Sequence, residues 1–193
     1  MTGRPAVFVD RDGVLVADEG VRPADAELVP LPGVVEALAT LRRAGFAVVV
    51  VTNQTVVARG LATELEVDAA HARLDAVLRS RGAFIDRWET CPHHPDATLP
   101  AYRVACECRK PRPGMLLRAA EALGLDLDAS WMVGDRPSDV AAGARAGCRT
   151  VLVTTGRHDD APIVSAEAPF VVAPTHVCAG LAEAVAVIVG AAP

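Results

Sequence analysis

The 193-residue sequence predicts a three-layer, Rossmann-like α/β fold built around a mostly parallel sheet. Short apolar runs typical of strands buried on both faces alternate with segments in which apolar residues recur every three or four positions, as on one face of a helix. Strands that alternate with helices favour parallel pairing through right-handed crossovers. No linker or repeat interrupts the pattern, so we expect residues 1–193 to form a single domain.

The first half of the chain contains three predicted strands and two predicted helices. The strands are the apolar runs Ala6–Val9, Phe46–Val51 and about Ile85–Thr90. Apolar spacing predicts a helix that starts near Val34 and closes at Gly45. A second helix is predicted behind the capping-box pair Thr63 and Glu66, and it ends at Gly82.

The second half repeats the alternation. Strands are expected at Ser130–Val133, at Thr150–Val153 and near Phe170–Val172. Helices are expected between Pro113 and Gly124, over about Ser138–Ala146, and through Leu181, Val185 and Ile188.

Composition excludes several classes of protein. The net charge is −5 and no run of Lys and Arg compensates locally, so nucleic acid is not an expected partner. No apolar run approaches the roughly 20 residues that cross a bilayer, and the N-terminal apolar stretch is too short for a secretory signal. We expect a cytoplasmic monomer that does not bind membranes.

Polar residues stand directly after three of the predicted strands. They are Asp10 and Asp12, then Thr52, Asn53 and Gln54, then Asp135 and Asp139. Ligands bind at the carboxyl ends of strands in open parallel sheets, so these residues are expected to converge. One Asp after a strand is as often only a turn former or a helix cap. The prediction of an active site therefore depends on all three groups together with a lysine.

Four motifs resemble the haloacid dehalogenase superfamily in order and together cover nearly the whole chain. They are DRDGVL at Asp10–Leu15, VVTNQ at Val50–Gln54, RKPRPG at Arg109–Gly114 and VGDRPSD at Val133–Asp139. The resemblance implies that superfamily's fold and a Mg²⁺-dependent phosphate monoester hydrolase that forms a phosphoaspartate.

The chemistry of phosphate esters assigns roles to the acidic residues. Asp10 is expected to attack phosphorus, as carboxylates do once cations neutralise the phosphate. Asp12, two residues further along an extended chain, should point to the same side, protonate the leaving oxygen and later activate water. Mg²⁺ suits Asp10, Asp135 and, by the resemblance, the backbone carbonyl of Asp12. Asp139 is expected to support these ligands from behind.

Neutral and basic residues complete the predicted site. Lys110 and the Thr52 hydroxyl are expected to stabilise charge on the transferred phosphoryl group. A lysine is usually a surface residue, but its place in the RKP motif favours the functional interpretation. Asn53 and Gln54, which follow Thr52 in the second motif, are expected to contact substrate.

A cysteine-rich loop, residues 91–110, predicts a zinc site. Cys91, His93, Cys106 and Cys108 could supply three thiolates and one imidazole, a set that suits tetrahedral Zn²⁺. Buried thiols unrelated to metal are the alternative from spacing alone. His94 could replace His93, although the family pattern favours His93. His71, His158 and His176 match no motif and are taken as helix-surface or loop residues.

The zinc-loop motifs narrow the resemblance to one branch of the superfamily. CPHHP at Cys91 and CECRKP at Cys106 resemble small phosphatases that act on heptose bisphosphate or histidinol phosphate, and ARG at Ala58–Gly60 resembles the heptose form. The segments DEGVRP at Asp18–Pro23 and TVV at Thr55–Val57 depart from that pattern and leave the exact sugar and anomer open.

The spacing of the motifs leaves no room for a cap domain over the site. A phosphorylated sugar is therefore the expected substrate, recognised by short loops. Arg59 and Arg109 could each bind a second anionic group through a two-point fork, which favours a bisphosphate over histidinol phosphate. Two rival interpretations are a phosphoacceptor signalling domain, which needs no second acid after the acceptor, and a zinc-held binding module without turnover.

Overall fold

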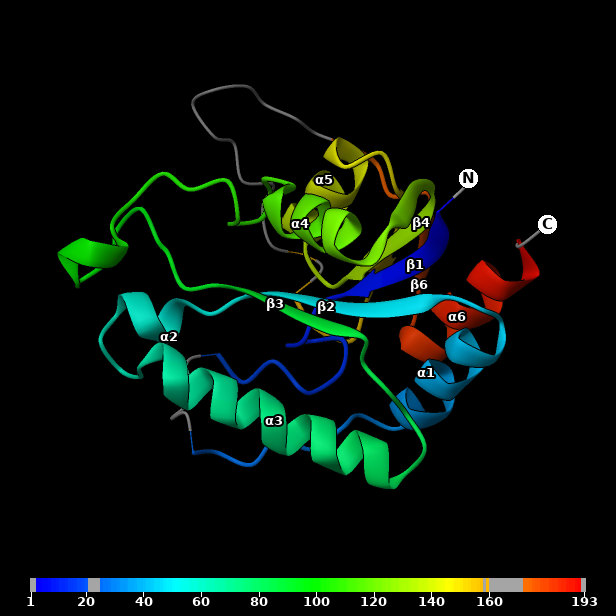
Figure 1. Cartoon of the computed structure of the whole chain (residues 1–193), viewed down its shortest axis with the longest axis horizontal. Helices are drawn as coiled ribbons and strands as arrows, with labels where there is room; N and C mark the ends of the chain where they lie inside the picture. The colour runs from blue at the N-terminus through cyan, green and yellow to red at the C-terminus, as the bar shows by residue number, and fades with distance from the viewer. Residues whose placement is uncertain (1–2, 21–24, 158, 160–171, 192–193) are drawn as a thin grey trace.

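The computed structural model describes residues 3–20, 25–157, 159 and 172–191 (Figure 1). Six parallel strands form one sheet in the order β3-β2-β1-β4-β5-β6. The strands are β1 (Arg4–Val9), β2 (Ala47–Asn53), β3 (Arg87–Cys91), β4 (Leu125–Gly134), β5 (Arg149–Val153) and β6 (His176–Cys178). The predicted three-layer, parallel α/β fold is confirmed.

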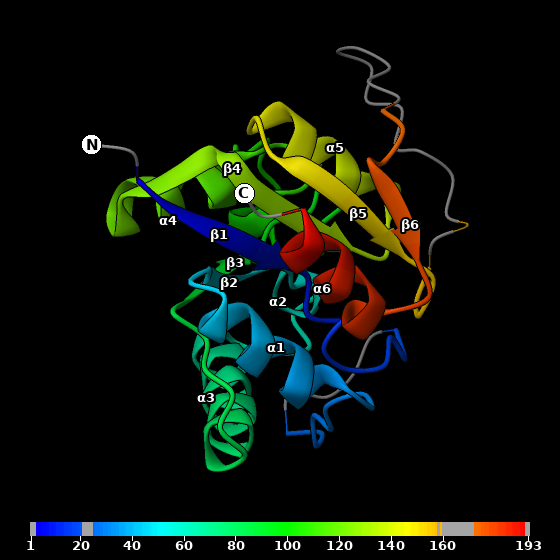
Figure 2. The same cartoon turned by 90° about the vertical axis from the view of Figure 1, so that its right-hand side faces the viewer.

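Helices cover both faces of the sheet, as Figures 1 and 2 show. One face carries α4 (Gly114–Leu123) and α5 (Pro137–Arg145), and the other carries α1 (Val34–Arg43), α3 (Glu64–Ser80) and α6 (Leu181–Gly190). A short helix α2 (Thr55–Ala58) and a 3₁₀ turn η1 (Pro100–Tyr102), which lies within the cysteine-rich loop, were not predicted.

Successive side chains of the central strands point to opposite faces of the sheet, so the core has two parts, one under each layer of helices. Val7 and Val9 of β1 pack with the residues of α1, α3 and α6, whereas Ala6 and Phe8 pack with those of α4 and α5. All four side chains are fully buried. A strand covered on both faces must be apolar at every position, which is why β1 and β2 were recognisable as continuous apolar runs.

Local signals account for the helix termini. The Thr63 hydroxyl accepts a hydrogen bond from the backbone N–H of Glu66, and the Glu66 carboxylate accepts one from the backbone N–H of Thr63, which confirms the capping box at the start of α3. Helix α4 ends at Gly124, whose φ of 63° lies in the left-handed region.

The last predicted strand, near Phe170–Val172, falls mostly outside the described residues. Residues 170 and 171 lie outside the described part of the chain, Val172 is in no strand, and the strand beside β5 is His176–Cys178. In this edge strand only Cys178 is buried, so it has no apolar run to mark it. His176, taken as a helix or loop residue, lies in β6. The fourth strand also begins earlier than predicted, because Leu125 pairs with Arg4 of β1.

The described elements include no cap domain. Only α1 lies between β1 and β2, and only α2 and α3 lie between β2 and β3. Within the described residues, no helix combines the length and the apolar character needed to cross a membrane.

Candidate active site

The predicted convergence is found at the carboxyl end of the sheet. Asp10 follows β1 and Asp135 follows the adjacent strand β4, and the backbone N–H of Asp10 donates to the carbonyl oxygen of Val133 over 3.0 Å. The chain runs outward in both directions from the β1/β4 pair, which is where open α/β sheets bind ligands. A cavity of about 550 Å³ opens there, lined among others by Asp10, Asp12, Thr52 and Lys110.

Asp10, the predicted nucleophile, is buried and paired with a cation. Its Oδ2 lies 3.0 Å from Nζ of Lys110, and its Oδ1 accepts a hydrogen bond of 2.7 Å from the backbone N–H of Arg11. Burial raises the pKa of Asp10 to about 8 against the opposing effect of Lys110, and the neighbouring carboxylates add to the rise. A second cation at this place would favour the ionised form that attack requires.

Lys110 lies at the centre of this arrangement. It is the only lysine in the sequence and is 1% exposed. Its Nζ donates to the carbonyl oxygen of Val51 over 2.8 Å and lies 2.6 Å from Oδ1 of Asp139 as well as 3.0 Å from Asp10. Burial works against the charge, but the two carboxylates outweigh it and raise the pKa of Lys110. Lys110 is therefore a fixed positive charge beside the nucleophile.

Three buried acids form a group that could hold a metal ion. One ligand atom from each of Asp10, Asp135 and Asp139 lies within 4.8 Å of the other two. The Oδ1 atom of Asp135 is buried without a hydrogen-bond partner among the described residues, and burial followed by the Asp139 charge raises the pKa of Asp135 to about 6. Three carboxylates against one lysine leave excess negative charge, which fits a hard cation such as Mg²⁺.

Asp139 has a different environment from the other two acids. Its Oδ2 accepts a hydrogen bond of 3.0 Å from the backbone N–H of Arg136 at the start of α5, and its Oδ1 faces Lys110. Asp139 thus contacts Lys110 directly, and its supporting position behind the metal ligands stays a prediction.

Two glycines make room for the acids. A Cβ atom at Gly13, whose φ is +81°, would collide with the carboxylate of Asp135, and one at Gly134 would collide with the side chain of Asp139. Any larger residue at either place would displace a carboxylate of the cluster.

The second motif supplies polar groups from the end of β2. The Thr52 hydroxyl is buried, lines the cavity and accepts a hydrogen bond of 2.7 Å from Nε2 of Gln54. The Asn53 amide exchanges two hydrogen bonds with the backbone of Lys110, of 3.1 and 3.2 Å. Asn53 and Gln54 line the cavity, and their amides also position Lys110 and Thr52.

The side chain of Asp12 lies at the edge of the cavity and is about one quarter exposed. Arg11 donates to both of its carboxylate oxygens, and Nε2 of Gln54 donates to Oδ2 over 2.9 Å. The prediction that Asp12 faces the same site as Asp10 is consistent with this placement. Among the described residues, the group of acids that could hold a metal does not include the Asp12 side chain.

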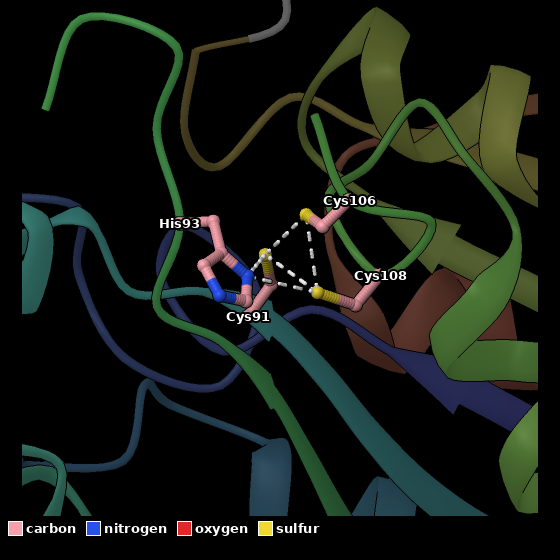
Figure 3. Close-up of side chains that lie close together, drawn as sticks. All are labelled: Cys91, His93, Cys106 and Cys108. Atoms are coloured by element: carbon pink, nitrogen blue, oxygen red, sulfur yellow. Dashed lines mark hydrogen bonds between the residues drawn. The ribbon is translucent and has the colours of Figure 1, made fainter. Parts of the chain in front are cut away.

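The four predicted zinc ligands come together, and their side chains point toward one another in Figure 3. The Sγ atoms of Cys91, Cys106 and Cys108 lie 3.1 to 3.6 Å apart, and Nδ1 of His93 lies 3.4 Å from Sγ of Cys108. Zn–S bonds near 2.3 Å place tetrahedral sulfur ligands about 3.8 Å apart, so the cluster could close around one ion with little movement. With four protein ligands, such a site would be structural.

His93 and its neighbour His94 have separate environments. Nδ1 of His93 joins the cysteine cluster, whereas Nδ1 of His94 accepts a hydrogen bond of 3.0 Å from the backbone N–H of Asp96, and His94 lines the cavity. The expectation of His93 as the ligand fits this geometry.

The two predicted arginines come from different segments, Arg109 from the cysteine-rich loop and Arg59 from the end of α2. Arg109 and Arg59 both line the cavity. Arg109 is half-buried and donates from NH1 to the carbonyl oxygen of His93 over 3.0 Å, while Arg59 is exposed at the end of α2. Burial lowers the pKa of Arg109.

A second pair of arginines on the cavity wall was not predicted from the sequence. Arg136 and Arg157 both line the cavity, and their guanidinium groups lie 2.7 and 3.0 Å from Oδ2 of Asp18. The backbone N–H of Arg157 also donates to Oδ2 of Asp135 over 2.7 Å. Arg157 follows β5, so the rule that identified the polar residues after the other strands would have found it.

His71 was expected on the surface and is instead 4% exposed. It lies on α3 with its ring stacked on Trp88 of β3, the centroids 4.6 Å apart. Its Nε2 lies 3.1 Å from NH1 of Arg11, itself buried. No sequence motif marks this contact, because it joins α3 to β3 and to the first motif only in three dimensions.

The sequence is similar to known families of hydrolases. A family model described as haloacid dehalogenase-like hydrolase matches residues 7–96, and one described as HAD-hydrolase-like matches residues 107–184. A D-glycero-beta-D-manno-heptose-1,7-bisphosphate 7-phosphatase from Photorhabdus laumondii is 44% identical over 156 residues, which is 80% of this chain and 83% of that protein. The chain belongs to the haloacid dehalogenase-like hydrolases.

Further relatives narrow the similarity to phosphatases of this family. The protein of the same name from Escherichia coli K12 is 42% identical over 154 residues, with 79% and 81% of the two chains covered. The crystal structure of D,D-heptose 1,7-bisphosphate phosphatase from B. bronchiseptica, complexed with magnesium and phosphate, is 35% identical with a TM-score of 0.79 and covers 97% of this chain and 99% of that one. This haloacid dehalogenase-like chain is a phosphatase.

Proposed function

We propose that this phosphatase removes the 7-phosphate from D-glycero-D-manno-heptose 1,7-bisphosphate through a phosphoaspartate on Asp10. The observation that carries the chemistry is the buried Asp10–Lys110 pair at the base of an open cavity whose wall holds several arginines. The names of the relatives support the choice of sugar.

In the first half-reaction, a carboxylate oxygen of Asp10 attacks phosphorus and the bond to the sugar oxygen breaks. Lys110 and the Thr52 hydroxyl face the phosphoryl oxygens and stabilise their charge. The sugar alkoxide is a poor leaving group, so it needs a proton, which Asp12 supplies. In the second half-reaction, the deprotonated Asp12 takes a proton from water, which attacks the same phosphorus and releases Asp10.

The residues present fit a magnesium ion. Asp10, Asp135 and the backbone carbonyl of Asp12 would hold it, while Asp139 keeps Lys110 in place behind them. When bound, the ion supplies positive charge that lets two anions approach each other. Oδ1 of Asp135, which has no hydrogen-bond partner in the described part of the chain, and the raised pKa of Asp10 support this assignment.

We propose that the zinc loop fixes the positions of Arg109 and Lys110 relative to the two phosphates of the substrate. A closed zinc site at Cys91, His93, Cys106 and Cys108 would fix the chain segment that immediately precedes Arg109 and Lys110. Lys110 would then stay at the phosphoryl group that is cleaved, and Arg109 and Arg59 would bind the second phosphate near the rim of the cavity.

Hydrolysis assays with a panel of phosphate esters test the proposal. The panel holds the heptose bisphosphate, a heptose monophosphate, histidinol phosphate and an aryl phosphate, and the highest kcat/KM is expected for the bisphosphate. Asp10→Asn should abolish turnover of all four without unfolding the protein, because an amide cannot attack phosphorus. Preference for histidinol phosphate would refute the choice of substrate. A long-lived phosphoaspartate with negligible turnover would instead indicate a phosphoacceptor domain.

A further inference from the structure

We infer that His71 is a positioning residue that acts through Arg11 on the side chain of Asp12. This inference rests on the proposed function, because it assumes that Asp12 is the acid that protonates the leaving group. The three side chains come from two distant parts of the sequence, α3 and the segment after β1, and they form one hydrogen-bonded chain that ends at the cavity.

Arg11 holds Asp12 by a fork. Its Nε lies 3.1 Å from Oδ2 of Asp12, and its NH2 lies 2.8 Å from Oδ2 and 3.1 Å from Oδ1. The same NH2 donates to Oε1 of Gln54 over 2.9 Å. A guanidinium is planar and rigid, so once its orientation is set, the carboxylate that it grips is oriented as well.

The remaining nitrogen of the guanidinium, NH1, meets His71, which is not among the residues that line the cavity. NH1 of Arg11 lies 3.1 Å from Nε2 of His71, and both side chains are more than 90% buried. Arginine has donors only, so Nε2 of His71 must be the acceptor and the ring must be neutral. Burial, with a further effect from Arg11, lowers the pKa of His71 to about 3, which keeps the ring neutral at physiological pH.

His71 is itself held in place by packing. Its ring stacks on Trp88 with an interplanar angle of 17°. Helix α3 is anchored at its start by the Thr63–Glu66 capping box, and Val67 and Ala70 of the same helix line the cavity. The acceptor therefore has a fixed position relative to the site, and it fixes the rotation of Arg11.

The network continues to the phosphoryl-binding side. Nε2 of Gln54 donates both to Oδ2 of Asp12 and to the Thr52 hydroxyl, at 2.9 and 2.7 Å. Loss of the His71 acceptor would leave a buried N–H of Arg11 without a partner and would let the fork turn toward water. Asp12 would then lose its orientation while Asp10 and Lys110 keep theirs.

Two substitutions at position 71 separate positioning from packing. His71→Phe keeps a buried ring against Trp88 but removes the acceptor, whereas His71→Gln removes the ring but keeps an acceptor oxygen at a similar reach. For each variant, kcat/KM is measured on the sugar phosphate and on an aryl phosphate, whose leaving group needs no proton. His176→Phe, on the exposed β6, is the matched control.

We expect His71→Phe to lower kcat/KM for the sugar phosphate about 10- to 100-fold, because it removes part of the contribution of general acid catalysis. For the aryl phosphate, kcat/KM should change less than about threefold. His71→Gln should restore most of the loss. Arg11→Lys, which keeps the charge but not the fork, should show the same selective loss and serves if His71→Phe fails to fold.

Equal losses on both substrates would overturn the inference, because a packing role does not depend on the leaving group. A greater loss in His71→Gln than in His71→Phe would also overturn it, because the ring would then matter more than the acceptor. Wild-type protein that hydrolyses neither substrate would refute the proposed function instead. Thermal unfolding midpoints of all variants confirm that each comparison is made between folded proteins.

Discussion

The Nζ atom of Lys110 lies 3.0 Å from Oδ2 of Asp10, and this lysine is the only one in a chain with 19 basic residues. The other 18 are arginines. A primary ammonium is compact enough to fit among Asp10, Asp139 and the carbonyl oxygen of Val51, whereas a planar guanidinium would need more space. The site therefore holds an ammonium group, whereas the other Lys and Arg positions of the chain are all arginines.

Lys110→Met should abolish phosphatase activity and destabilise the protein by about 3 to 5 kcal/mol in the absence of divalent cations, because it leaves buried carboxylates without their counter-charge. Urea unfolding at neutral pH measures the loss. Lys110→Arg should also be inactive, since the larger group displaces Asp10 or Asp139.

A double variant serves as the control for this prediction. Lys110→Met combined with Asp10→Asn removes the opposing charge as well, so it should recover part of the lost stability while remaining inactive. Destabilisation that is the same in the single and double variants would show that Lys110 stabilises the fold by packing and not by its charge.

Arg109→Ala should lower kcat/KM for the bisphosphate about tenfold or more and lower that for a monophosphate of similar size much less, since a charge-assisted hydrogen bond contributes about 1.5 to 3 kcal/mol. Steady-state kinetics on both substrates measures the ratio. Arg81→Ala, at the exposed end of α3, is a control outside the cavity. Equal losses on the two substrates would mean that Arg109, through its bond to His93, only orders the loop.

Metal analysis of freshly purified protein should find about one zinc per chain, as a closed four-ligand site requires. Cys106→Ser should lose the zinc and lower both stability and activity, because Lys110 lies in the same loop, two residues after the ligand Cys108. Cys148→Ala, a buried thiol outside the cluster, should keep the zinc. Zinc retained at full occupancy in Cys106→Ser would contradict the ligand set.

Asp18 gives a prediction for the acid range. Burial alone raises the pKa of Asp18, but the backbone N–H of Gly20 and the guanidinium of Arg136 outweigh it, so the pKa lies below the usual 3.8. A lowered pKa means that the carboxylate contributes stability that is fully present above about pH 4 and is lost as the pH falls through the folded value.

The stability difference between wild type and Asp18→Asn should therefore be largest near neutral pH and should shrink as the pH falls from 4 to 2. Urea unfolding across that range measures it, with Asp68→Asn on the exposed face of α3 as the control. A difference that stays constant with pH would show that Asp18 contributes through packing and not through its ion pairs.

The sequence by itself determined the strands that the helices cover on both faces. Such strands must be apolar at every position, so β1 and β2 were visible as runs, and the acids that follow them were visible as interruptions. Short spacings also indicated the Cys/His cluster, because Cys91 with His93 and Cys106 with Cys108 form two local clamps. The edge strand β6 was not predicted, because an edge strand with exposed side chains has no apolar run.

Only the tertiary structure decided which charges meet across the site. Asp18 lies 118 residues from Arg136, and Arg11 lies 60 residues from His71, so no local spacing could relate either pair. The burial of His71 depends on the packing of α3 against Trp88, and a histidine on a polar helix carries no signal of that contact. Charge pairing and side-chain orientation in a cavity follow from the crossover connections of the sheet, and these bring together residues that the sequence keeps apart.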